Sequence, residues 1–149
     1  MRLLPVVCML VFVMGLGGVQ GLAAQATPAS NSTMNRNDYL LRKIDITTRF
    51  DAEKADFPQL LEANALTELA GSVYRFLVIR DDGCGLEVPD ESLRVSHVLW
   101  CESLAIGADA AIASVSGKLR NDAAHIAHAN QLWTESYDLL GMSEAVSLP

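Results

Sequence analysis

The feature that most constrains how this chain can fold is a run of apolar and aromatic residues near its C-terminal end. The run steps by four and three residues in alternation, through Leu119, Ala123, Ile126, Asn130, Trp133, Tyr137 and Leu140. Because an α-helix has about 3.6 residues per turn, residues with this spacing lie on one side of a helix and can form its seam with a neighbour. Asn121 or Asp122 is suited to cap this helix, and Gly141 is suited to close it.

Two earlier segments also carry helical patterns. Residues 38–50 contain a short apolar run that favours a helix, although several of its last residues are β-branched. A further helix is expected to begin at Asp56 and Pro58, because aspartate caps a helix and proline suits its first turn. We expect it to end near Arg80, where a turn signal begins. Its apolar stripe contains Leu66, Leu69, Ala70, Val73, Tyr74, Leu77 and Val78.

The remaining helix follows Pro89, and it could begin at Asp90 or later. Its predicted apolar stripe contains Val98, Cys101, Ala105, Ala108, Ile112 and Val115, and Gly117 is expected to end it. The first part also alternates as a strand would. The many alanine and glycine residues between 105 and 113 allow another helix backbone to approach closely. Since the predicted links are short, consecutive helices should run antiparallel. The sequence therefore predicts an all-α fold, an antiparallel up-down bundle of about four helices.

The N-terminal residues match the pattern of a removable export signal. Arg2 is followed by an apolar run from residue 3 to residue 19, and Ala24-Gln25-Ala26 fits the small-x-small requirement of a cleavage site. The same run could be a membrane anchor, but a spanning helix needs roughly 20 apolar residues and usually a basic stop. We therefore expect a periplasmic or secreted protein without stable membrane insertion after cleavage. The expected parts are a signal peptide (1–26), a disordered polar tether (27–37), a helical bundle domain (38–142) and a short tail (143–149).

Composition excludes two classes of partner. The chain has 149 residues and a formal net charge of −7, with no cluster of basic residues. Nucleic acids and anionic membrane surfaces both require a patch of lysine and arginine, so neither is an expected partner. The acidity itself is accounted for by solubility. After removal of the signal, the chain is long enough for one domain with a single core.

Two cysteines, Cys84 and Cys101, remain after signal cleavage, and in an oxidising compartment such a pair most often forms a disulfide. If the third helix starts at Asp90, Cys101 lies about 16 Å along it. The bridge then requires that the loop after Cys84 folds back along the helix, or that the helix starts later. We predict an intramolecular disulfide, with intermolecular pairing or free thiols as alternatives.

The histidines suggest a metal site, but only weakly. His125 and His128 are three residues apart, so they share one face of a helix. In a hairpin turning near Lys118 they would lie opposite Ile112 and Asp109, which would put His97 about 20 Å away. Since two ligands alone hold a metal weakly, we expect this pair to be a solvated helix face, and we predict no metal and no cofactor.

No catalytic motif is present. The sequence has no Gly-x-Ser-x-Gly elbow, no Cys-x-x-Cys redox motif and no phosphate-binding loop. Paired carboxylates occur at Asp81-Asp82 and Asp90-Glu91, but their positions are typical of turns and helix caps. No residue is therefore assigned a catalytic role, and we predict that the protein is not an enzyme.

The remaining function is binding. Trp100 is a large amphipathic side chain next to the loop that follows Cys84, so Trp100, Asp81, Asp82 and Leu86 are the candidate partner-binding residues. The alternative for Trp100 is a core position covered by that loop. The leading hypothesis is an exported binding module that holds a protein partner, and analogy of layout adds an inhibitor or immunity-type protein as a sub-class. The alternatives are a small-molecule or metal-ion binder that uses the bundle interior or His125 and His128, and a self-associating structural protein. The sequence leaves the oligomeric state open.

Overall fold

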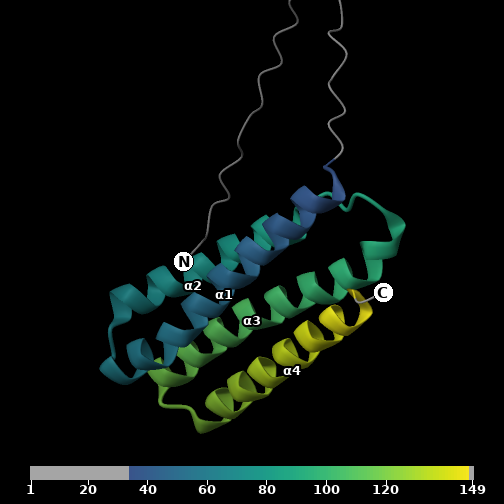
Figure 1. Cartoon of the computed structure of the whole chain (residues 1–149). Helices are drawn as coiled ribbons and strands as arrows, with labels where there is room; N and C mark the ends of the chain where they lie inside the picture. The colour runs from purple at the N-terminus through teal and green to yellow at the C-terminus, as the bar shows by residue number, and fades with distance from the viewer. Residues whose placement is uncertain (1–33, 148–149) are drawn as a thin grey trace, which may run out of the picture. The chain divides into compact units, whose positions relative to one another are not determined.

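A computed structural model describes residues 34–147, which form an all-α bundle (Figure 1). This part of the chain contains no strand, and consecutive helices run antiparallel, so the predicted fold class is confirmed. The predicted signal peptide and most of the predicted tether lie outside the described residues. The elements are α1 (Arg36–Ala63), α2 (Leu66–Cys84), the short 3-10 helix η1 (Glu91–Leu93), α3 (Arg94–Arg120) and α4 (Ala123–Ser147).

The boundary between α1 and α2 differs from the prediction. Pro58 lies inside α1 and does not begin a new helix. Phe57, beside it, is buried against Phe76 and Trp133, and this packing holds the helix in place where proline removes one backbone hydrogen bond. The helix ends at Asn64, which adopts a left-handed conformation with φ 54°. Asparagine is one of the few residues with a side chain that takes this conformation readily, and it commonly closes a helix.

Two glycines that predicted helix ends lie inside helices instead. Gly83 is buried in the last turn of α2, where a Cβ would come 3.1 Å from the Trp100 ring. Gly117 is buried in α3, where a Cβ would come 2.9 Å from Cγ1 of Ile126. Both glycines therefore allow close packing, and neither acts as a turn. α3 instead ends at Asn121, which is left-handed with φ 50°.

α4 begins as expected and continues further than expected. The Asp122 side chain caps it by accepting hydrogen bonds from the backbone N–H groups of Ala124 and His125, at 2.9 and 3.2 Å. Gly141 lies inside the helix and does not close it. The helix continues to Ser147, and Ser143 is fully buried. Residues 143–147 are thus part of the bundle and not of a tail.

α3 and α4 pack along a seam of small residues that repeat every seven positions. Ser103 and Ser136 face each other, and each hydroxyl donates to the other residue's backbone carbonyl at 2.8 Å. Ser96 and Ser143 make the same reciprocal pair at 3.0 and 2.9 Å. Such short side chains let the two backbones approach closely, and Figure 1 shows the two helices side by side along their length. The seam consists of Ser96, Ser103, Ala110 and Gly117 on α3, with Ala129, Ser136 and Ser143 on α4.

The core lies between this helix pair and the other two helices. Its aromatic residues meet edge to face, with 5.4 Å between the ring centres of Phe50 and Phe76 and 5.6 Å between those of Phe76 and Trp133. The predicted stripes of α2 and α3 are only partly correct, because Leu66 and Tyr74 on α2 and Val98 and Ile112 on α3 are exposed. The stripe predicted for α4 is mostly wrong. Leu119 belongs to α3, Ala123, Ile126, Asn130 and Tyr137 are exposed, and only Trp133 and Leu140 pack against the core. The buried cluster consists of Ile46, Phe50, Phe57, Leu69, Phe76, Ile79, Trp100, Leu104, Ala108 and Ala111.

Candidate functional site

Trp100 is a core residue and not a surface contact. Its relative exposure is 0%, and its indole N–H donates to the Thr47 hydroxyl at 3.0 Å. The ring packs against His97 on one side and lies 5.4 Å from the Lys43 ammonium. In this structure a partner cannot reach Trp100. Its burial agrees with the alternative interpretation of the sequence, in which Trp100 is a core residue.

Asp81 and Asp82 lie at the surface, but their charges are already paired. Asp82 pairs with Arg49 at 2.9 Å, and Asp81 pairs with Arg80 at 2.8 Å. Leu86 is half-buried and lines a groove of about 530 Å³ together with Asp82 and the exposed Leu41. The groove is walled by α1, the end of α2 and the loop after Cys84, and it presents two arginines and two aspartates. It therefore offers little net charge to select a partner.

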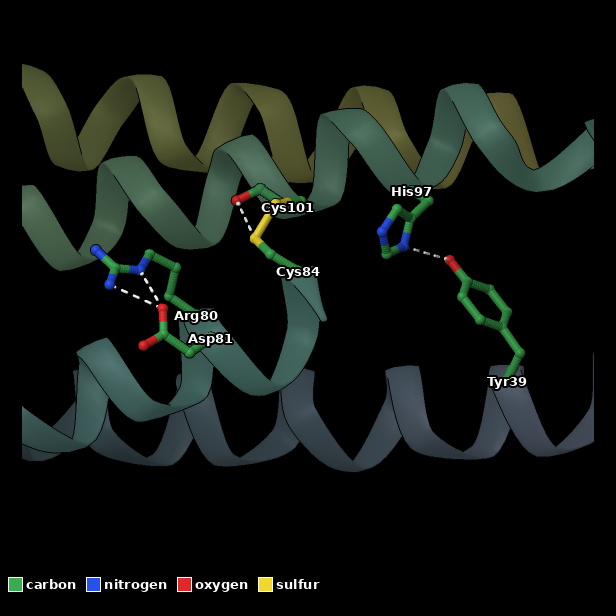
Figure 2. The surroundings of a disulfide bond; sticks show 6 residues. All are labelled: Tyr39, Arg80, Asp81, Cys84, His97 and Cys101. Atoms are coloured by element: carbon green, nitrogen blue, oxygen red, sulfur yellow. Dashed lines mark hydrogen bonds and ion pairs between the residues drawn. A yellow bond between two sulfur atoms is a disulfide. The ribbon is translucent and has the colours of Figure 1, made fainter. Parts of the chain in front are cut away.

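The predicted disulfide is present and fastens α2 to α3. Figure 2 shows Cys84 at the end of α2 bonded to Cys101 in α3, and their Cα atoms are 5.1 Å apart. The geometric difficulty noted from the sequence is removed because α2 extends to Cys84 and α3 begins only at Arg94. The bridge therefore joins two helices directly and does not require the loop to fold back.

The histidines do not converge on a metal site. Nδ1 of His125 lies 2.7 Å from the Asp122 carboxylate that caps α4, and His128 is exposed. Among residues 34–147, no group of three or more histidine, cysteine, aspartate or glutamate side chains could hold a metal ion. His97 lies elsewhere, buried under α1. The metal alternative therefore gains no support from the structure.

A buried polar cluster joins α1 to the seam between α3 and α4. The Tyr39 hydroxyl and Nδ1 of His97 are 3.1 Å apart (Figure 2), and the Lys43 ammonium donates to the hydroxyls of Ser96 and Ser143 at 2.9 and 3.1 Å. Burial raises the pKa of Tyr39 to about 12. Burial lowers the pKa of His97, and the nearby charge of Lys43 lowers it further. These shifts favour a neutral pair in which the Tyr39 hydroxyl donates to the imidazole.

A second lysine of α1, Lys54, is buried at its charged end. The face of Tyr137 covers its ammonium, the Trp133 ring centre lies 5.4 Å away, and no side chain or backbone atom of the described chain accepts a hydrogen bond from it. Burial lowers the pKa of Lys54 to about 8, and the charge of Asp51 offsets this only in part. A buried charge without a hydrogen bond destabilises the folded state, so the charged form of Lys54 lowers the free energy of unfolding.

Replacing this lysine should therefore stabilise the protein. We expect Lys54→Met to raise the free energy of unfolding by about 1 kcal/mol at pH 7, because methionine keeps the contact with the two rings without a buried charge. Lys54 has a pKa near 8 in the folded state and 10.5 in the unfolded state. Between these two pH values, Lys54 holds its proton in the unfolded state and loses it in the folded state. Stability should therefore rise as the pH rises through this interval. Urea unfolding at several pH values from 7 to 9.5 measures both effects, and an equal rise in the Lys54→Met variant would contradict this explanation.

An apolar stripe lies on the side of the α3–α4 pair that faces away from α1. In both helices the residues four positions after a seam residue face the core; for example, Gly107 lies under Phe50, and Trp133 lies beside Phe57. The residues three positions after a seam residue flank the seam on the opposite side. The flanking apolar residues on α3 are half-buried, as are those on α4 except Val146, which is exposed. We call this set the outer stripe; it contains Leu99, Ile106, Ala113, Leu132, Leu139 and Val146.

The outer stripe explains why neither helix shows a clear polar face. Surface helices of globular proteins usually have one apolar and one polar side, whereas a helix that is apolar all round is covered on all sides. Residues Glu91–Arg120, which include α3, are long and apolar enough to cross a membrane by length and composition alone, a test that core helices of soluble proteins also pass. Only 44% of the most apolar stretch of these residues is buried. α3 therefore carries more apolar surface than α1, α2 and α4 cover.

Except for Arg120 at the end of α3, three positions after Gly117, the charged side chains around the outer stripe are acidic. Residues 95–117 and 123–147 contain no lysine or arginine. Three of their acids, Glu102, Asp109 and Glu135, occupy the position before a seam residue, so they border the outer stripe. We call these three residues the acidic rim. All three are exposed, and none makes an ion pair within the described chain.

A separate groove of about 400 Å³ lies between α2 and α3 near the end of the bundle where α3 turns into α4. It is mainly apolar, and Ile112 and Leu119 are exposed in it. Arg120 lines it as well. The groove is shorter than the outer stripe and is open to solvent along one side.

Sequence reasoning missed the outer stripe and the seam for the same reason. The predicted stripes were chosen for large apolar residues, whereas the seam is made of serine, alanine and glycine. The seven-residue repeat of small residues from Ser96 to Gly117, matched by the repeat from Ala129 to Ser143, was the signal that could have located both.

Comparison with protein families, with curated proteins and with solved structures finds no match to this chain.

Proposed function

We propose that this protein is an exported, non-enzymatic binding module that holds a protein partner on the outer stripe of α3 and α4. The observation that carries the proposal is the apolar surface on the side of the α3–α4 pair that α1 and α2 leave open. Exposed apolar surface bordered by polar residues is typical of interaction sites, because its burial by a partner is favourable. An inhibitor or immunity-type role belongs to this class.

The interior supports binding rather than catalysis. The titratable residues of the buried polar cluster, Tyr39, His97 and Lys43, are packed between helices. The grooves described above are lined by none of them. A catalytic acid or base must reach a substrate, so these residues are better accounted for as interior contacts that orient α1 on the helix pair.

Two features support export. The N-terminal sequence has the pattern of a cleavable signal, and the disulfide between Cys84 and Cys101 is of a kind that persists mainly in oxidising compartments. We therefore place the working protein in the periplasm or the secreted space.

Site-specific crosslinking tests the proposed surface. A photoreactive phenylalanine is introduced in separate variants at Val146, in the outer stripe, and at Val95, which borders it one position before the seam residue Ser96. Control variants carry it at Leu41 on α1 and at Tyr74 on α2, which are at least as exposed. After irradiation in the producing cells, we expect one adduct of defined mass from the first two variants and none from the control variants. The captured protein is then identified by mass spectrometry and purified.

Binding of the purified partner provides the decisive measurement. We expect Val95→Gln combined with Val146→Gln to weaken binding about tenfold, because loss of buried apolar contacts acts mainly on dissociation. The matched double variant Leu41→Gln with Tyr74→Gln should bind as the native protein does. Adducts from α1 and α2 alone, or equal losses of affinity in both double variants, would refute the proposed surface.

A further inference from the structure

The shape of the outer stripe indicates what kind of element it can receive. Leu99 and Ala113 are about 21 Å apart along α3, at 1.5 Å per residue. One row of aliphatic side chains on α3 and one on α4 flank the groove between these helices, where the two backbones approach closely. A helix of about four turns fits along such a groove, because its side-chain ridges can pack into the groove between two helices.

The opposite side of the same helix pair already shows this mode of packing. There, α1 lies along α3 and α4, with Phe50 over Gly107 and Phe57 beside Trp133. The outer stripe offers a second surface along the same two helices. The described chain contains no strand, so it offers no free strand edge to which an extended peptide could add.

The acidic rim favours a positively charged helix on the outer stripe. Glu102 and Asp109 border the stripe on α3, Glu135 borders it on α4, and no basic residue of these helices lies between residues 95 and 117 or 123 and 147. A helix with lysine or arginine beside its apolar face would pair with the rim while burying its apolar side chains. Complementary charges of this kind speed association and select partners.

The same charges exclude a second copy of this chain. Two outer stripes face to face would bring Glu102, Asp109 and Glu135 of both copies together, and like charges across an interface are unfavourable. The chain's own N-terminal residues, 1–33, contain a single basic residue, Arg2, so they do not match the rim either.

On these grounds we propose that the partner presents a cationic amphipathic helix, which lies along the outer stripe between α3 and α4 with its basic residues against Glu102, Asp109 and Glu135. This inference rests on the proposed function and specifies its partner. It can fail while the proposed surface stands, if crosslinking at Val146 captures a partner that has no such helix.

A synthetic peptide tests the inference without knowledge of the partner. The probe is a helix of leucine and lysine about 18 residues long, with leucine on one face. Two control peptides have the same length: one replaces every lysine by glutamate, and the other has the probe's composition in an order that is not amphipathic. Binding to the full-length protein is measured by calorimetry at about 50 mM and about 300 mM salt. We expect saturable binding of the probe alone, with an affinity that falls as salt increases.

Charge reversal locates the bound peptide. We expect Glu102→Lys with Glu135→Lys to weaken probe binding about tenfold, because both changes place a like charge beside the peptide. The matched variant Glu62→Lys with Glu68→Lys changes the net charge equally on exposed positions of α1 and α2, and it should bind within about twofold of the native protein. Circular dichroism confirms that both variants remain folded.

Three outcomes would overturn the inference: no binding of the leucine–lysine probe, equal binding of the glutamate peptide, or equal loss of affinity in both charge-reversal variants. The last would mean that the peptide responds only to the overall charge of −7. In each case the crosslinking result still decides the proposed function separately.

Discussion

Replacement of Gly107 by valine should lower the free energy of unfolding by about 3 kcal/mol, one of the two largest effects we expect from a small change in this protein. Gly107 lies on α3 where Phe50 of α1 crosses it, and a Cβ there would overlap the ring carbons Cζ and Cε2 of Phe50. It would also come 3.1 Å from the Ser136 hydroxyl across the seam. Because Phe50 is held by Phe76, the ring cannot move without disturbing the core. Urea unfolding followed by circular dichroism measures the loss.

Gly141→Ala is the control for this prediction. Gly141 also lies inside a helix, but a Cβ there would meet no atom within 4 Å. Since alanine is favoured over glycine in a helix, this variant should be more stable than the native protein by about 1 kcal/mol. Opposite signs at the two glycines would show that packing decides the cost at Gly107. A Gly107→Val variant as stable as the native protein would mean that α1 and α3 do not cross at this point.

Removal of the disulfide should have an effect of similar size. The double variant Cys84→Ala with Cys101→Ala is expected to lose about 3 kcal/mol of stability, because the bridge closes a loop with a sequence separation of 17 and so restricts the unfolded chain. The helices themselves should remain, since the apolar contacts of Leu69, Phe76 and Leu104 do not depend on the bridge. Thermal unfolding under oxidising conditions provides the measurement.

Reductant distinguishes the bridge from other effects of the two substitutions. Dithiothreitol should shift the unfolding of the native protein to that of the double variant and leave the double variant unchanged. If alkylation and mass spectrometry of the unreduced native protein found two free thiols, or a disulfide between two chains, the intramolecular pairing would be refuted.

The candidate site was predictable only in part. The pairing of Cys84 with Cys101 followed from their being the only cysteines after the predicted signal peptide, and the structure places them at bonding distance. Trp100 was a candidate binding residue because it lies beside the loop that follows Cys84. Its burial between α1, α2 and α3 makes it a core residue. Asp81 and Asp82 stay at the surface, where neighbouring arginines pair with them.

The sequence alone determined that the chain is helical and that its helices run antiparallel. Three-and-four spacing of apolar residues and the short links between the segments are local properties, so they could be read without knowledge of the packing. Asp122 was likewise predictable as a cap, because a capping side chain bonds the backbone within its own turn.

Tertiary structure alone decided where the helices end and which faces meet. Pro58 is a local signal for the start of a helix, and Gly83, Gly117 and Gly141 are local signals for an end, yet each lies inside a helix. Neighbouring side chains pack closely against Gly83 and Gly117. In α3 and α4, apolar residues occur all round, so several stripes fit the spacing equally well. Ser96, Ser103, Ser136 and Ser143 settle the choice, because a serine hydroxyl becomes favourable in an interior only when a carbonyl of the facing helix accepts its hydrogen bond.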